Sequence, residues 1–276
     1  MQESLPSIKL TSDLEPIRKQ IEATIKPYIE IQPILSKNKL TLWQSKFGGY
    51  PYFPKDLNYP KNPDGDPLYL LAQINLAEVP PLQGFPIQGI LQFYIDGYHD
   101  SYGFDYDDMT NQSHFRVLYF PEIETNEEKL ITDFNFLPDI IEAEIIFPFL
   151  GSFALTFTKK YEPISGDDYQ LEPLLQNYID SHHLDGKLDV FDLLEDYLDL
   201  YDGEKHKLGG YPFFTQDDPR FSLAEGVEPY YLLFQMISDD DADIWWGDAG
   251  VGNFFIQPSA LAKLDFSRVL YYYDCC

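Results

Sequence analysis

The sequence predicts an α+β fold that is rich in strands and built as an internal tandem duplication, with two pseudo-symmetric halves and an acidic helical insert. Three observations predict it: a motif that occurs twice, short apolar runs at matching places after each copy, and an acidic segment of helical periodicity between the copies. With 276 residues the chain can bury one large core. We therefore expect residues 1–276 to form a single compact unit.

The duplication is visible as a repeated motif. Residues 46–53 (KFGGYPYF) return as residues 207–214 (KLGGYPFF), an offset of 161, with six of eight residues identical. Further matches follow in the same order, 69–74 with 231–236, 89–95 with 250–256 and 116–119 with 268–271. Collinear matches with small shifts indicate a tandem duplication whose loops differ in length. We expect the first repeat at 38–120, the insert at 121–204 and the second repeat at 205–274.

Strands account for most of each repeat. Apolar runs rich in Tyr, Phe and Ile, bounded by Gly, Pro and Asp, are typical of strands that are buried on both faces. Such strands are expected at 68–74, 91–95 and 116–120 of the first repeat and at 230–237, 253–256 and 268–273 of the second. A proline in the first turn predicts a short helix at 258–264.

The segments outside the repeats predict both helices and strands. Ser12 and Glu15 form a capping-box pattern, and apolar residues at helical spacing predict a helix over 13–25 that ends before Pro27. Further strands are expected at 28–31, at 40–43 and as a pair within 144–159.

The insert predicts an amphipathic helix. Residues 163–204 are strongly acidic and contain a single Lys, yet apolar residues keep one helical face. That face consists of Val190, Leu193, Leu194, Tyr197, Leu198 and Tyr201. Asp189 can cap the start of the helix and Gly203 can close its end. We expect this helix to pack on the repeats and to present an acidic outer face.

The charge of the chain restricts its partners. Nineteen basic and 46 acidic residues give a net charge of −27 and a pI near 4.2. Such a field repels phosphate backbones and anionic lipids, so it argues against nucleic acid and membrane partners and favours a basic protein. Neither a long apolar span nor a leader is visible, and the adjacent Cys275 and Cys276 cannot form a disulfide framework. We expect a cytoplasmic location.

The paired Gly-Gly-Tyr-Pro motifs predict a turn in each repeat. Two glycines permit positive φ angles, and the proline holds the preceding Tyr extended. No Gly-Lys-Ser/Thr follows, so a phosphate-binding loop is not favoured. Lys46 and Lys207 are the best polar candidates beside the turns, and each is expected to pair with a carboxylate. Gln73 and Gln235 occupy matching places in the strands that follow.

The loop around Trp246 and Asp248 is the other candidate for a binding site. Asp239, Asp241 and Asp243 precede it at alternate positions, but an EF-hand loop needs Gly and Glu where this chain has Ile and Gly. We therefore predict no metal site, with these three carboxylates as the weak candidates for one. Asp248 is expected to cap a solvated turn.

Many motifs fall in the order that characterises one bacterial family. They are 45–51 (SKFGGYP), 71–74 (LAQI), 89–94 (GILQFY), 115–119 (FRVLY), 206–212 (HKLGGYP), 218–220 (DPR), 246–250 (WGDAG) and 265–269 (DFSRV). In these motifs the chain resembles the YwqG-like family of uncharacterised bacterial proteins. The resemblance implies a cytoplasmic protein of duplicated α+β build and suggests an interaction role such as toxin neutralisation. It implies no cofactor and no catalytic residues.

The sequence offers no catalytic constellation. The histidines lack His-Glu-x-x-His spacing, and there is no Gly-x-Ser-x-Gly elbow. We therefore expect a non-catalytic, acidic interaction protein that binds a basic protein without a cofactor. The alternative is an enzyme or small-ligand-binding protein that uses the cleft between the repeats. The candidate binding residues are Lys46, Gln73, Lys207, Gln235, Trp246 and Asp248.

Overall fold

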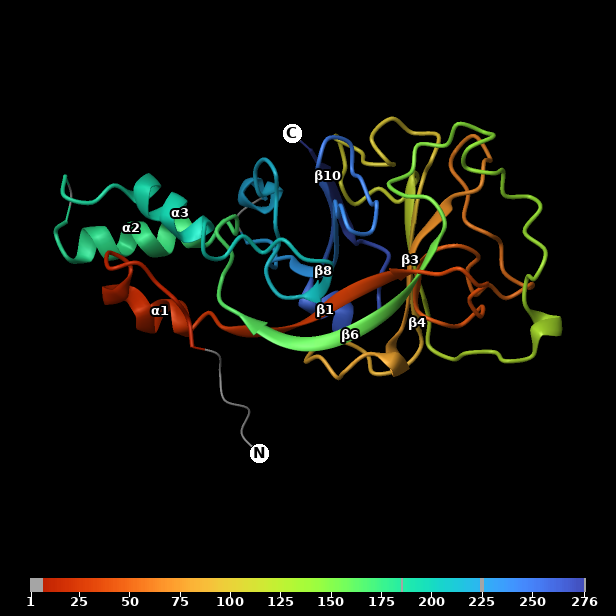
Figure 1. Ribbon diagram of the computed structural model, residues 1–276, viewed down its shortest axis with the longest axis horizontal. Helices are drawn as coiled ribbons and strands as arrows, with labels where there is room; N and C mark the ends of the chain where they lie inside the picture. Colours follow the sequence, from red (N-terminus) through yellow and green to blue (C-terminus); the bar gives the residue numbers. More distant parts are fainter. Residues whose placement is uncertain (1–6, 185, 224–225, 276) are drawn as a thin grey trace.

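The computed structural model describes residues 7–184, 186–223 and 226–275, and within them ten antiparallel strands form one sheet that curls into a nearly closed barrel (Figure 1). The strands are β1 Lys26–Leu35, β2 Lys46–Gly48, β3 Tyr69–Asn75, β4 Ile90–Ile95, β5 Phe115–Phe120, β6 Ser152–Glu162, β7 Lys207–Gly209, β8 Tyr231–Ile237, β9 Val251–Ile256 and β10 Leu270–Asp274. Their spatial order is β10-β9-β8-β7-β1-β6-β2-β3-β4-β5.

Two long strands, β1 and β6, lie at the centre of the sheet. They pair over ten residue pairs, from Lys26 opposite Glu162 to Leu35 opposite Phe153. Each also pairs with a short strand that is distant in sequence, β1 with β7 and β6 with β2. Outward from these short strands, β3, β4 and β5 follow on one side and β8, β9 and β10 on the other. In chain order β1 precedes β2–β5 and β6 precedes β7–β10, yet β1 pairs with β7 and β6 pairs with β2.

Matching positions on the two sides adopt matching backbone structure. The pairing of β3 with β4 shifts register between Leu70 and Ala72, and that of β8 with β9 shifts between Leu232 and Phe234. The glycine pairs after β2 and β7 are alike as well. Their φ angles are +62° and +68° at Gly48 and Gly49, and +66° and +74° at Gly209 and Gly210. The predicted left-handed turn is confirmed at both motifs.

The barrel closes around an aromatic core on the inner face of the sheet. The Phe93 ring lies 4.7 Å from that of Phe234 and 4.9 Å from that of Phe254, across the barrel. Phe47 packs on Phe234 at 6.0 Å. All four side chains are fully buried, and burying a Phe contributes about 1.5–3 kcal/mol. These contacts hold the two sides of the curled sheet against each other.

Three helices form a lobe beside the barrel (left in Figure 1). The helices of the chain are α1 Arg18–Glu22, α2 Leu171–Ser181, α3 Val190–Leu198 and α4 Pro258–Ala262, with short 3-10 helices η1 Glu15–Ile17, η2 Leu76–Glu78, η3 Glu127–Lys129 and η4 Pro219–Ser222. Buried Ile21, Leu175, Leu193 and Tyr197 form the core of the lobe together with Tyr211 from the turn after β7. None of the described helices has the length and apolar character needed to cross a bilayer.

Most elements expected in the repeats are confirmed. The six strands β3, β4, β5, β8, β9 and β10 lie where apolar runs predict them, with ends shifted by one or two residues. The short helix α4 begins at Pro258, as predicted. In α3, the Asp189 carboxylate accepts a hydrogen bond from Phe191 N at 2.8 Å, which confirms the predicted cap. This helix ends at Leu198, before Gly203, and α2 was not predicted.

The prediction of one helix over 13–25 is wrong. Only η1 and α1 form there, because Leu14 occupies the N-cap position without a side-chain hydrogen bond, while the Ser12 hydroxyl contacts Asp13. From Lys26 onward the chain is extended in β1. Pro27 does not end the element as expected. Pro27 has no backbone N–H to donate. Because β7 pairs only with 28–30 of β1, no carbonyl of β7 loses a hydrogen bond at Pro27.

Two strand predictions also need correction. No strand forms at 40–43, where Leu42 and Trp43 lie in a turn and the carbonyls of Thr41 and Leu42 accept hydrogen bonds from Lys46. Within 144–159 a single long strand, β6, replaces the expected pair. The partner of β6 is β1, more than a hundred residues earlier, which local patterns cannot reveal.

Substitution of the second motif glycine provides a test of the turn. A Cβ at Gly210 would meet Glu162 Oε1 and Tyr28 Cβ, whereas a Cβ at Gly65, also at positive φ, would meet nothing within 4 Å. We expect Gly65→Ala to cost about 1 kcal/mol from backbone strain alone and Gly210→Ala roughly 3 kcal/mol. Urea denaturation of both variants measures the difference. Equal costs would show that the close approach at Gly210 does not matter.

Candidate functional site

A row of buried polar side chains crosses the sheet on each side, on the face opposite the aromatic core. The rows are Lys46, Gln73 and Gln92 in β2, β3 and β4, and Lys207, Gln235 and Asn253 in β7, β8 and β9. Each side chain is at most 1% exposed. Buried polar groups need hydrogen-bond partners within the protein, so the partners of these rows decide what the residues do.

The two glutamines share three hydrogen bonds, and Gln73 Oε1 accepts a further one from Gln92 Nε2 at 2.7 Å. Gln73 Oε1 accepts from Tyr52 N at 2.8 Å, and its Nε2 donates to Leu42 O at 2.7 Å and Gln44 O at 2.8 Å. The corresponding partners of Gln235 are Phe213 N at 2.8 Å, Gly203 O at 3.0 Å and Lys205 O at 2.8 Å. Each glutamine therefore fastens the segments before and after a Gly-Gly-Tyr-Pro turn to the sheet.

Lys46 is held by backbone carbonyls. Its Nζ donates to the carbonyl oxygens of Thr41, Leu42 and Tyr50, at 2.5, 3.3 and 3.0 Å. Among the described residues no carboxylate forms an ion pair with it, so the predicted ion pair is wrong here. Burial lowers the pKa of Lys46 to about 7, and the nearby charge of Glu78 offsets only part of this effect.

Lys207 has the carboxylate partner that its sequence context predicts. Its Nζ lies 3.1 and 3.2 Å from the two carboxylate oxygens of Glu162, the last residue of β6. Glu162 Oε1 also accepts from Tyr211 N at 2.7 Å. Burial lowers the pKa of Lys207, while Glu162 opposes that shift. The carboxylate thus neutralises the lysine and holds the turn.

The two lysines do not face each other across one cleft. Lys46 lies beside Ala154, whose partner in β1 is Ile34, whereas Lys207 lies beside Glu30 of β1. These positions are four residues apart along β1, about 13 Å at the usual rise of a strand. The structure therefore brings Lys46 together with Gln73, and Lys207 together with Gln235, as two separate groups.

A cavity of about 460 Å³ opens beside Lys46. Gly48, Gly49 and Tyr50 line it from the turn, and Lys39 lines it from the loop after β1. Its apolar wall includes Leu70, Leu137 and Phe147. Ligand pockets typically enclose about 300–1,000 Å³ between mostly apolar walls and a few polar groups. The cavity fits that description and contains one of the predicted site residues.

Trp246 belongs to the core rather than to an open binding loop. Its side chain is 0% exposed, and its ring lies 5.1 Å from that of Tyr102 and 5.8 Å from that of Tyr273. Its Nε1 has no hydrogen-bond partner among the described residues. Asp248 is exposed nearby. The two residues were predicted as one site, but only Asp248 is open to solvent.

The weak metal candidates shape a turn. Asp239 Oδ1 accepts from Asp241 N at 3.0 Å, and Asp243 Oδ1 accepts from Trp245 Nε1 at 3.0 Å. Asp239 also contacts buried His206 at 3.2 Å, and this contact lowers the pKa of Asp239. Within the described part of the chain, no three potential ligands are gathered where they could hold a metal ion.

Sequence reasoning missed a buried ionic cluster around Arg220. Its guanidinium contacts both carboxylate oxygens of Asp218, at 2.9 and 2.6 Å, and the carboxylate of Asp168 at 2.9 Å. Burial alone would lower the pKa of Arg220, but the two carboxylates outweigh it and raise the pKa. The cluster joins the segment before α2 to the second side of the sheet. The Asp-Pro-Arg motif at 218–220 could have indicated half of it, whereas Asp168 is 52 residues away.

Removal of the Glu162 charge tests the role of the buried pair. Glu162→Gln keeps the shape of the side chain but leaves Lys207 buried without a counter-charge, so we expect a loss of about 3–5 kcal/mol in unfolding free energy. Glu30→Gln is the matched control, because Glu30 pairs with the half-exposed Lys160 and such a pair contributes less than about 1 kcal/mol. Denaturant unfolding at pH 7 measures both. Similar costs at the two sites would contradict the structural role of Glu162.

One family of known domains matches most of the chain. Residues 45–275 match the protein family described as "Domain of unknown function (DUF1963)". That span includes both Gly-Gly-Tyr-Pro turns, both polar rows and most of the sheet. A comparison with curated proteins found no match. Because the match covers most of its length, the chain belongs to the DUF1963 family of domains of unknown function.

Proposed function

We propose that this protein is a non-catalytic cytoplasmic interaction protein that binds a basic protein partner through the acidic outer face of α3. The composition of that face carries the proposal. Asp192, Glu195, Asp196 and Asp199 are exposed, and no ion pair joins them to another described residue. Phe191, 69% exposed, lies among them.

Charge and apolar surface together fit a partner that is both basic and amphipathic. The net charge of −27 attracts a basic protein over a distance and raises the rate of encounter. Exposed Phe191 and Leu198 offer apolar contacts of the kind that form the centre of an interface. A toxin with a basic surface is a partner of this chemistry.

The buried polar residues support a non-catalytic role. The side-chain donors of Gln73 and Gln235 are used by backbone carbonyls. Lys207 is neutralised by Glu162. Groups whose hydrogen bonds maintain the fold are not free to act on a substrate, so the surface is the better candidate for function.

We also propose that the two sides of the sheet arose by tandem duplication and that the chain is YwqG-like within its family. The matching register shifts, glycine φ angles and glutamine hydrogen bonds support a common origin. In this proposal β1 and β6 are added in front of the repeats predicted at 38–120 and 205–274, so the repeated units are β1–β5 and β6–β10. The acidic helices α2 and α3 are then an insertion within the second unit, between β6 and β7.

The alternative function, binding of a small ligand with or without catalysis, is favoured by one observation. The cavity beside Lys46 has the size of a ligand pocket and contains a buried lysine without a carboxylate partner. It lies within the first side of the sheet rather than between the two sides.

Neutralising the outer face of α3 tests the proposed partner surface. We expect Asp192→Asn, Glu195→Gln, Asp196→Asn and Asp199→Asn together to slow association with a basic partner, captured from the native host, by about tenfold at low salt. The effect should fade at physiological salt, where such charges are screened. Biosensor association rates at both salt concentrations measure it, with circular dichroism to verify the fold.

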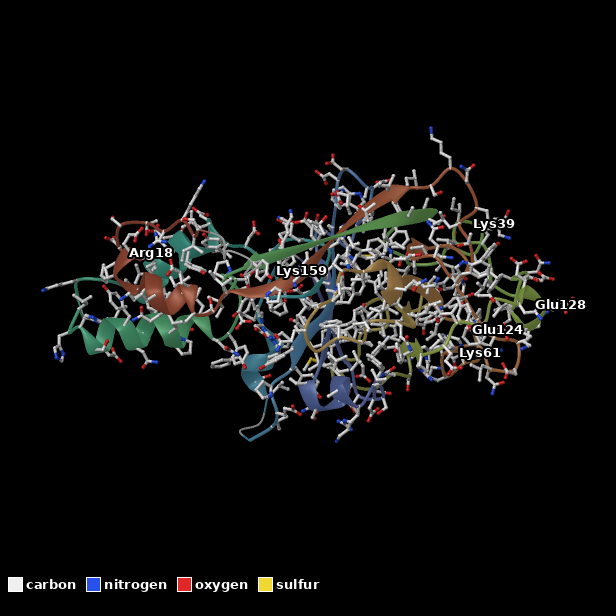
Figure 2. The ribbon with its side chains drawn as sticks, turned by 90° about the horizontal axis from the view of Figure 1, so that it is seen from below. Arg18, Lys39, Lys61, Glu124, Glu128 and Lys159 are labelled. Carbon is white, nitrogen blue, oxygen red and sulfur yellow. The ribbon has the colours of Figure 1, made fainter. Side chains whose placement is uncertain are left out.

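The control removes four charges at a distant site. Glu122, Glu127, Glu128 and Glu142 are exposed, and Glu128 lies at the opposite end of the molecule from Arg18 of the helical lobe (Figure 2). Their change to Gln should leave the association rate within about twofold of the original. An equal loss of association rate in both variants would show that only the net charge of the protein matters, which would contradict a binding face on α3. An unchanged rate in the α3 variant would also exclude α3 as the binding face.

A further inference from the structure

The two lysines at matching positions differ in one respect. On the second side of the sheet, the Glu162 carboxylate lies between Lys207 Nζ and Tyr211 N and accepts hydrogen bonds from both. On the first side, Lys46 and Tyr50 hold the matching positions, and a cavity opens beside them. The chain supplies a carboxylate to one lysine and an open space to the other.

Strand register shows why the first side lacks this carboxylate. On the second side, Tyr28 of β1 lies opposite Lys160 of β6, and Glu162 follows two residues later. On the first side, Ser152 of β6 is structurally equivalent to Tyr28, because Ser152 pairs with Gly48 as Tyr28 pairs with Gly209.

On the first side, the segment that pairs with Ser152 is the one that directly follows β1. Ser36 N donates to Ser152 O at 2.9 Å, and two residues later comes Asn38. Asn38 thus takes the place of Glu162. Its side chain is uncharged and the residue is exposed, so it does not neutralise Lys46.

We propose that the cavity beside Lys46 binds a small carboxylate with an apolar body, whose carboxylate takes the place that Glu162 holds beside Lys207. This inference rests on the alternative function, binding of a small ligand. The ligand carboxylate would accept hydrogen bonds from Lys46 Nζ and Tyr50 N. Of the three contacts that Nζ now makes, the one to Leu42 O, at 3.3 Å, is the longest and the easiest to exchange.

The other charged groups near the cavity do not replace the missing carboxylate. The Glu78 carboxylate accepts from Ser45 N at 3.0 Å on the far side of the strand end. Asp139 Oδ1 accepts from the N–H groups of Ile141 and Glu142, at 2.9 and 3.0 Å.

The remaining titratable groups of the cavity leave it positive. Lys39 adds a second positive charge at the cavity, on the loop after β1 and away from the helical lobe (Figure 2). Besides Asp139, Tyr50 and Tyr69 also line the cavity, and burial raises the pKa of Tyr69 so that its hydroxyl stays neutral. With Lys46 protonated, the lining carries two positive charges, on Lys39 and Lys46, against the one carboxylate of Asp139.

The walls of the cavity define the rest of the ligand. Leu70, Leu137 and Phe147 are apolar, and Gly48 and Gly49 expose backbone without a side chain. A volume of about 460 Å³ accommodates a body the size of an aromatic or branched aliphatic group. Phenylacetate and 4-methylpentanoate are therefore suitable probes, and phenylacetamide is the neutral counterpart of the first.

Calorimetric titration with these three compounds tests the proposal. We expect both carboxylates to bind, and phenylacetamide to bind at least tenfold more weakly because it carries no charge for Lys46. Equal affinity for phenylacetate and phenylacetamide would overturn the carboxylate assignment while leaving a small-ligand function in place. Absence of binding by all three at millimolar concentration would overturn both.

Two variants locate the site. Leu40 lines the cavity and is half-exposed, so Leu40→Trp should fill part of it while Lys46 is kept, and we expect at least a tenfold loss of phenylacetate affinity. Leu57→Trp, at a leucine that is 49% exposed and lies outside this cavity, is the matched control and should bind as the original protein does. Binding that survives in Leu40→Trp would place the ligand elsewhere and overturn the proposal.

The pH dependence of binding identifies Lys46 itself. Since burial lowers its pKa to about 7, an anion that binds the ammonium form raises this pKa and draws a proton from solution. We expect phenylacetate affinity to fall by about tenfold per pH unit between pH 7 and 9, with proton uptake seen as a buffer-dependent enthalpy. Lys46→Met should remove this dependence together with the affinity. Affinity that is constant from pH 6 to 9 would overturn the role of Lys46.

Discussion

The antiparallel pairing of β1 with β6 is the interaction on which the rest of the sheet depends. Its ten residue pairs form a long central ladder, whereas β2 and β7 contain three residues each. Strands so short do not persist alone, and each is held because it lies between a long central strand and the next strand outward. Each of these two short strands begins with a lysine and ends with the first glycine of a left-handed pair. The position of the cavity beside Lys46 therefore depends on the pairing of β1 with β6.

The polar rows show that the two sides keep one geometry with different interiors. Gln92 Oε1 accepts a hydrogen bond from the Tyr94 hydroxyl at 2.8 Å. At the matching place, Asn253 Oδ1 is buried without a partner among the described residues. Phe255 stands where Tyr94 would be, so the hydroxyl is missing. A buried acceptor without a donor costs about 1–3 kcal/mol, a cost that the second side tolerates.

Sequence patterns predicted what is local and missed what depends on distant partners. The strands from β3 to β5 and from β8 to β10 carry their own apolar signal, and Asp189 marks the start of α3 within two residues. Glu162 neutralises Lys207 across 45 residues, a distance over which no spacing rule applies. The same reasoning assigned Lys46 a carboxylate that the chain does not provide. The cavity could not be predicted, because the residues that line it, spread from Ser36 to Ser152, are brought together only by the fold.

The exchange of first strands means that neither side of the sheet can be completed by its own five strands. β2 pairs with β3 on one side, but it acquires its neighbour on the other side only when β6 has been synthesised, about a hundred residues later. During synthesis one edge of β2 therefore stays unpaired until β6 is made. Closing a loop of that length slows the final assembly of the sheet. A single five-strand unit could complete its sheet only by exchanging strands with a second copy, as in a domain-swapped dimer. Under the duplication proposed above, the present chain corresponds to such a dimer with its two subunits joined covalently.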